Sequence, residues 1–600
     1  MLFMLLLTFA HAKETRLHTV TAAAETNVCE ILGDKAYADL GDALKAVTNG
    51  QTIKLLQNIN YQKTNSNGIE IDGKSITFDL NGFNLNVVAD NIALYVRNDG
   101  EVKLTGIGEF NVTSKSSAGV AAQNGGKATV ANVTGFSHGV SADNNTTVTV
   151  TGNVTSIENS SRGIQAYDNA TVTVHGSVTG NLYGIWARNN ATVTVTGNVT
   201  STGGNTMDSG IDADGNVNVT VGGDVSAKWY GIYAKNGAVV KVAGNTTGDN
   251  STGGYSGPFG TDKPRGCGII ASSGSNVSVG GDAIGVDCGV SISDNATVTV
   301  SGSATGKQYG IQAESGTHVT AGSAKGEIAD GIDAGKGANV TVTGGVTGGR
   351  FGILVRDNNT IVTVTGNVSG SGQDGISTMN GSKVTVTGDV IGGGNGVITR
   401  QNSMVNVSGS VTGNNNSGVY AIDNSTVTIG GDVIGNRGVN IQYGGNGVSL
   451  QDVKGVKVTI DGQIKAKEPQ DYGYIMISTE TDNPFSITYL SFSHSDNQPT
   501  SSKAGYLEYT DGKSYVWVKG EDITGTDNIL QPSSSLKAYI QNGCLHVSGL
   551  TVGDLWTVYN LSGMIVHQNR AAAEEADINL PAKGIYIIVS ARQSAKAGNF

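Results

Sequence analysis

Five aspartates are the first candidates for chemistry in this sequence: Asp212 and Asp214 in GIDADG, Asp333 in GIDAGK, and Asp330 and Asp374 directly before Gly-Ile pairs. Paired carboxylates can act as general acid and base in polysaccharide cleavage. Asp212 and Asp333, however, belong to copies of one phrase that lie far apart in the chain. We interpret all five as turn and ladder residues and assign no catalytic residue. The sequence holds no zinc pattern, phosphate-binding loop or nucleophile elbow, so no metal or cofactor is predicted.

Aromatic residues gather in two copies of the same phrase, YGIWA and WYGIYA: Tyr183, Trp186, Trp229, Tyr230 and Tyr233. Aromatic rings that share one exposed surface can stack on sugar rings. We expect these five residues to form a ligand-binding patch, bordered by the longer segments 201–209 and 248–266. The alternative is that the rings shield strand edges or pack against the longer segment.

The spacing of two cysteines predicts a contact. Cys267 and Cys288 are 21 residues apart, and each directly precedes a glycine of the repeated phrase. Equivalent positions on stacked strands lie about 5 Å apart, within the range that a disulfide accepts. We predict that Cys267 and Cys288 form a disulfide, whereas Cys29 and Cys544 lie near opposite ends of the chain and have no evident partner.

The repeated phrase begins with Gly-Ile or Gly-Val, and its glycines mark thirteen copies: Gly139, Gly163, Gly184, Gly210, Gly231, Gly268, Gly289, Gly310, Gly331, Gly352, Gly375, Gly396 and Gly418. Seven of the twelve spacings are 21 residues. Such a period is too short for helical repeats and suits one coil of a parallel β-solenoid. The sequence therefore predicts an all-β fold, a parallel β-helix of about 21 residues per coil.

Each copy contains three short extended pieces. In the first, Ile185 and Ala187 alternate with Trp186, so the aliphatic side chains face inward. The second is a T-V-T-V run, and Gly197-Asn198 leads into a third. We expect Gly and Asn at the corners to adopt positive φ angles, and corner asparagines on stacked coils to bond to one another in ladders.

The two ends of the repeat differ from its middle. Residues 36–59 predict a short helix with Leu40, Ala43, Leu44 and Val47 on one face, followed by a strand. Together with the segment 73–87, this region resembles the opening coils of right-handed parallel β-helix proteins on bacterial surfaces. The resemblance implies an N-terminal helical cap over the first coils.

The last 65 residues or so contain two motifs, VYNLSG at 558–563 and LPAKGIYI at 580–587. With these motifs, this segment resembles the C-terminal sorting domain of type IX secretion substrates in Bacteroidetes. The resemblance implies a small β-sandwich, passage through the outer-membrane secretion machinery, and a secreted or cell-surface location. We divide the chain into a signal peptide (1–12), an N-terminal cap (13–68), the β-helix (69–464), a β-rich end cap or linker (465–532) and the sorting-domain-like sandwich (533–600).

Composition limits the function classes. The net charge is −12 and no segment is rich in Lys or Arg, which argues against nucleic acid as a partner. No apolar run reaches the roughly 18–20 residues of a transmembrane helix, and MLFMLLLTFAHA resembles a signal peptide. We expect an adhesin-like surface protein that presents its repeats to polysaccharide or to a host surface glycoprotein. The alternatives are a carbohydrate-active β-helix enzyme and a purely structural spacer.

Overall fold

The computed structural model describes residues 26–204, 208–249, 266–436, 445–451, 455–466, 474–480, 487–520, 536–541, 543–560, 564–580, 584–590 and 593–599. The chain divides into two compact units, Met1–Glu521 and Asp522–Phe600. The predicted signal peptide 1–12 and most of the segment 248–266 lie outside the described residues.

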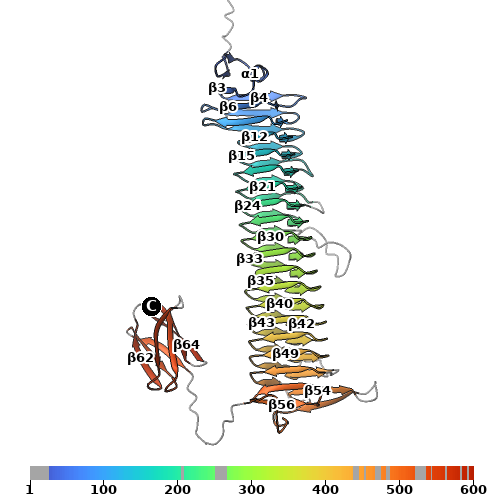
Figure 1. The fold of residues 1–600 in the computed structure, drawn as a ribbon, viewed down its shortest axis with the longest axis vertical. Coiled ribbons are helices and arrows are strands. Elements are labelled where there is room, and N and C mark those ends of the chain that lie inside the picture. Colours follow the sequence, from blue (N-terminus) through green and yellow to red (C-terminus); the bar gives the residue numbers. More distant parts are fainter. Residues whose placement is uncertain are drawn as a thin grey trace, which may run out of the picture. The chain divides into compact units, whose positions relative to one another are not determined.

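The first unit is a parallel β-solenoid of about 17 turns with about 22 residues per turn, which confirms the predicted fold class. Its coils stack along one axis, as Figure 1 shows for the strands between β4 and β54. One sheet, here called sheet B, contains one strand per coil: β5 (Ile69–Asp72), β8 (Leu94–Arg97), β11 (Ala118–Gln123), β14 (His138–Asp143), β17 (Arg162–Tyr167), β20 (Tyr183–Arg188), β23 (Ser209–Asp214), β26 (Tyr230–Lys235), β29 (Cys267–Ala271), β32 (Cys288–Ile292), β34 (Tyr309–Ala313), β36 (Ile332–Ala334), β39 (Ile353–Val355), β42 (Ile376–Thr378), β45 (Val397–Thr399), β48 (Val419–Ile422), β51 (Val448–Gln451) and β54 (Ile475–Glu480).

The remaining strands of each coil belong to a second sheet, sheet A. In the coil of β20 these are β21 (Thr192–Val195) and β22 (Val199–Ser201), which pair in register with the equivalent strands of both neighbouring coils. Val193 and Val195 point inward and are buried, as are Ile185 and Ala187 of β20. The inward valines, isoleucines and alanines of successive coils form one continuous hydrophobic core.

Asparagine and glycine serve different purposes at the corners of the coils. Asn189 and Asn190, between β20 and β21, have the predicted positive φ angles of 50° and 63°. Gly197 and Asn198 do not, so that part of the corner prediction is wrong. A Cβ atom on Gly197 would lie 2.7 Å from the carbonyl oxygen of Gly176 in the preceding coil. Glycine is needed there because neighbouring backbones approach closely.

Both ends of the solenoid are covered by other elements. At the N-terminal end, helix α1 (Leu40–Ala46) buries Leu40 and Ala43, and Asp39 caps its first turn. At the other end, β54 pairs with β55 (Ile487–Phe492), and β56 (Tyr506–Thr510) pairs with β57 (Tyr515–Lys519), both antiparallel. These hairpins continue sheets B and A and replace the exposed strand edges.

The second unit consists of two antiparallel sheets. One contains β58 (Lys537–Gln541), β59 (Cys544–Ser548) and β62 (Glu575–Asn579). The other contains β60 (Leu555–Asn560), β61 (Ile565–Arg570), β63 (Gly584–Ser590) and β64 (Gln593–Asn599). Leu545, Val547, Trp556, Val558 and Ile588 share one buried core, as in the predicted small β-sandwich.

Candidate functional site

The predicted aromatic patch lies on the outer side of sheet B. Trp186 of β20, Asp212 of β23 and Tyr233 of β26 are directly paired in register. We call such a row of register-paired residues, one per coil, a column, so Trp186 and Tyr233 stand on one column two coils apart. Tyr183 and Tyr230 stand on the next outward column, on either side of Ser209. We call the outward side chains of β17, β20, β23 and β26 the aromatic face.

Trp186 is the centre of this face. Arg162 and Arg188 lie on its ring, with guanidinium carbons 4.8 Å and 4.5 Å from the ring centroid, and Tyr167 meets it edge-on at 6.4 Å. The Trp186 side chain remains partly exposed. Cation–π contacts of this kind stabilise each exposed pair by about 0.5–1 kcal/mol. They hold the indole in one orientation.

The charge of Arg188 is neutralised by carboxylates. Its Nη2 lies 2.9 Å from Asp212 Oδ1, and its Nε lies 3.6 Å from Asp214 Oδ2. Burial raises the pKa of Asp212, and the nearby Arg188 partly offsets that rise. Lys235 also approaches Asp214, at 3.4 Å, so the cations on this side of Trp186 are already paired.

Arg162, the other arginine over the Trp186 ring, has no carboxylate partner among the described residues. Its Nη1 donates to His138 Nε2 at 3.0 Å, and its guanidinium lies over the ring of Tyr183 at 5.8 Å. Its buried Nε has no hydrogen-bond acceptor among those residues. Burial, together with the charge of Arg162, lowers the pKa of His138, which keeps that imidazole neutral at pH 7 and able to accept this bond.

The other end of the patch is packed rather than exposed. Trp229 and Tyr230 are only 7% and 6% exposed, and they share a cluster with Cys267 and Cys288. Tyr233 stacks on Tyr230 with ring centroids 5.8 Å apart and is partly exposed. Of the five predicted residues, Tyr183, Trp186 and Tyr233 therefore present a surface, whereas Trp229 and Tyr230 support it.

Cys267 and Cys288 are paired in register on β29 and β32 and form a disulfide with a Cα–Cα distance of 4.7 Å. They stand on the same column as Tyr230, which is paired with Cys267. The disulfide therefore forms the apolar platform against which Tyr230 packs. Cys29 is free and buried, and Cys544 is free and half-buried.

The candidate carboxylates are tied to other polar groups. Asp330 receives two hydrogen bonds from Arg350, at 2.9 Å and 2.6 Å, and Asp374 receives two from Asn395. Asp333 is bound to Arg356, and burial raises its pKa to about 6. Asp212 and Asp333 stand on the same column several coils apart, with Tyr233 the first of the residues between them.

In the described part of the chain, one group of three His, Cys, Asp or Glu side chains lies close enough together to hold a metal ion. Cys544 and His546 of β59 and Asp577 of β62 place ligand atoms within 4.8 Å of one another. Zinc accepts such sulfur, nitrogen and oxygen ligands. In this structure His546 Nδ1 lies 2.7 Å from Asp577 Oδ1 and the ring stacks on Tyr539. Sequence reasoning missed the group because it depends on the pairing of β59 with β62.

The chain matches no protein-family model and no curated protein. No helix among the described residues is long and apolar enough to cross a membrane. The two motifs of the predicted sorting domain lie on adjacent strands, because Tyr559 of β60 pairs with Ile587 of β63. Residues 561–563 and 581–583 of these motifs are outside the described part.

Proposed function

We propose that this chain is a secreted or cell-surface, adhesin-like solenoid whose aromatic face binds glycans that carry a carboxylate group. The observation that carries the proposal is the contrast between two arginines on one tryptophan. Arg188 is already paired with Asp212, whereas the contacts of Arg162 within the described part of the chain are to His138 and two aromatic rings. Arginine binds carboxylates strongly through paired hydrogen bonds.

The ligand class follows from these neighbours. The partly exposed side chain of Trp186 and the ring of Tyr233, two coils away at the equivalent position, offer aromatic surface for the apolar side of a sugar. A uronic or sialic acid residue would place its carboxylate near Arg162 while its ring packs beside the exposed part of Trp186. A host polysaccharide or surface glycoprotein would supply several such residues along the coils.

A glycan-array screen of the full chain tests this proposal, with acidic and neutral glycans side by side. We expect saturable binding of carboxylated glycans, weakened about tenfold or more in Trp186→Ala and Arg162→Gln, and weakened less in Tyr233→Ala. Tyr95→Ala is the matched control, because Tyr95 also stands on sheet B beside an arginine, Arg97, that is paired with Glu70. Equal binding by all four variants would refute the proposal.

We further propose that residues 533–600 serve as a sorting domain for export and that residues 1–12 form a signal peptide. The sandwich of two sheets and the pairing of the two motifs support the first part. Removal of 533–600 should leave the solenoid inside the producing bacterium, as measured by fractionation and immunoblotting. Normal release of the truncated chain would contradict it.

A further inference from the structure

One corner in the middle of the solenoid is longer than the equivalent corners of the coils on either side. Between sheet B and sheet A, Ala334 is followed five positions later by Asn339, the first residue of the next strand. In the following coil Ile361 comes six positions after Val355. In the next coil the count returns to five, from Thr378 to Lys383. One residue is therefore inserted at the corner that contains Asp357, Asn358 and Asn359.

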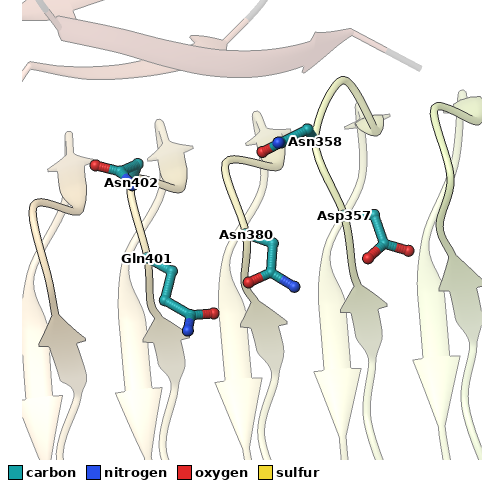
Figure 2. Close-up of a pocket in the computed structure, with 5 residues that line it drawn as sticks. All are labelled: Asp357, Asn358, Asn380, Gln401 and Asn402. Atoms are coloured by element: carbon teal, nitrogen blue, oxygen red, sulfur yellow. The ribbon is translucent and has the colours of Figure 1, made fainter.

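The polar side chains around this insertion surround a hollow of about 650 Å³: Asp357, Asn358, Asn380, Gln401 and Asn402. Figure 2 shows that Asp357, Asn380 and Gln401 lie in one row on successive coils, while Asn358 and Asn402 lie farther along the corner turns. Neighbouring coils are about 4.8 Å apart. The row therefore offers a regular series of polar groups along the solenoid axis.

These side chains are free to bind a ligand. No hydrogen bond joins any two of the five side chains, and the four amide side chains are exposed. The Asp357 carboxylate has a single partner, the backbone N–H of Lys336, which donates to Oδ2 at 3.3 Å. Each amide offers one acceptor and two donors, and the carboxylate offers acceptors only.

The chemistry of the hollow favours hydroxyl groups as ligands. A hydroxyl both donates and accepts, as the amides do, and it can donate to the Asp357 carboxylate. With one carboxylate among its five lining residues, the hollow lacks the charge of a typical calcium site. Ile361 and Met404 begin the sheet A strands that follow two of these corners, and they are 39% and 40% exposed.

We infer that this hollow binds a neutral oligosaccharide that lies along the solenoid axis. Its hydroxyl groups would replace the missing side-chain hydrogen bonds between Asp357, Asn380 and Gln401. The site is separate from the aromatic face in sequence and in ligand charge. The inference therefore does not depend on the proposed binding of acidic glycans.

Isothermal titration of the full chain with neutral tetrasaccharides of glucose, mannose and N-acetylglucosamine tests the inference. We expect one of these probes to bind, and the double variant Asn380→Ala/Gln401→Ala to weaken its binding about tenfold or more. Deletion of Asn358, which restores the ordinary corner length, should abolish binding because it closes the row. Unfolding curves of each variant establish that the solenoid is intact.

Two controls separate this site from the aromatic face. Asn295→Ala removes an exposed asparagine from the same corner of another coil and should leave binding unchanged. Arg162→Gln should weaken acidic glycans and leave the neutral tetrasaccharide unaffected. The inference is overturned if no neutral tetrasaccharide binds, or if binding survives both the double variant and the deletion.

Discussion

Asp168 and Asp357 occupy the same corner position on two coils, and each is followed by an asparagine in the next coil. In the first pair, Asn189 Nδ2 donates to Asp168 Oδ1 at 2.9 Å. No such bond joins Asn380 to Asp357. The flanking strands pair in register in both regions, through Ala166 with Ala187 and Val355 with Thr378. The backbone ladder alone therefore does not determine the side-chain ladder.

The two regions also differ in the length of the corner. In the coils between Asn98 and Asn236, corner amides repeatedly bond to the coil before: Asn124 to Asn98, Asn144 to Asn124, Asn169 to Asn145, and Asn236 to Asp214. The series ends at Asn236, because no amide side chain at this corner bonds to the coil before it in the described residues that follow. The corner at Asp357 differs from its neighbours in addition by one inserted residue. The closed ladder contributes to stability, whereas the open row leaves polar groups available to solvent and ligands.

The largest predicted effect tests whether the coils around Asp168 and the coils around Asp357 have the same backbone packing outside the corner. A Cβ atom on Gly184 would lie 2.7 Å from Gly210 O, and one on Gly352 would lie 2.5 Å from Gly375 O. We expect Gly184→Ala and Gly352→Ala each to lower the free energy of unfolding by about 3 kcal/mol, as overpacking does. Urea unfolding of both variants measures this. A loss at only one of the two glycines would mean that the regions also differ in their packing.

The shared part was predictable from the sequence. The spacing of the Gly-Ile phrase predicts the number of residues per coil. The alternation in Ile185-Trp186-Ala187 predicts which side chains point inward and outward, because β-strands have a period of two. The corner insertion also leaves a signal, since Gly352 and Gly375 are 23 residues apart. That number does not say which corner of the coil takes the extra residues, so the open row could not be located.

The second effect uses pH and concerns the sheet B strand next to the corner rather than the corner itself. Asp333 lies on β36, which pairs with β39, the strand before the Asp357 corner. Burial raises the pKa of Asp333 from 3.8 to about 6. Between these values the folded state binds more protons than the unfolded state, so stability falls as pH rises from about 4 to about 6. We expect wild type to lose roughly 2 kcal/mol relative to Asp333→Asn across this window. Parallel pH profiles would show that Arg356 fully compensates the buried charge.

The candidate site was harder to predict than the fold. Aromatic type and spacing located Trp186 and Tyr233, which indeed share a column. Sequence alone could not reveal that Trp229 and Tyr230 are buried, because their burial depends on the disulfide platform on the next two coils. Whether a carboxylate reaches Arg162 depends on which side chains extend across coils, and no local pattern encodes that.

The third effect compares the two asparagines directly. Asn189→Ala removes a charge-assisted hydrogen bond to Asp168 and should lower the free energy of unfolding by about 1 kcal/mol. Asn380→Ala removes no side-chain hydrogen bond and should change it by less than about 0.5 kcal/mol. Thermal unfolding of the two variants in one buffer makes the comparison. Equal losses would show that the ladder bond adds nothing to stability.

The smallest predicted effect comes from a deletion that gives the Asp357 corner the same length as the Asp168 corner. Deletion of Asn358 leaves Arg356-Asp357-Asn359-Thr360, the same length as Tyr167-Asp168-Asn169-Ala170. Asn380 Nδ2 should then reach Asp357 Oδ1, as Asn189 reaches Asp168. One exposed hydrogen bond and a shorter corner should raise the free energy of unfolding by about 0.5 kcal/mol.

The further change Asn380→Ala separates this bond from the shorter corner. In the deletion background it should cost about as much as Asn189→Ala costs in wild type, whereas in wild type it costs almost nothing. A double-mutant cycle over the deletion and Asn380→Ala measures that coupling. Zero coupling would mean that the corner length does not control the ladder, and the open row would then need another cause, such as the longer side chain of Gln401 on the next coil.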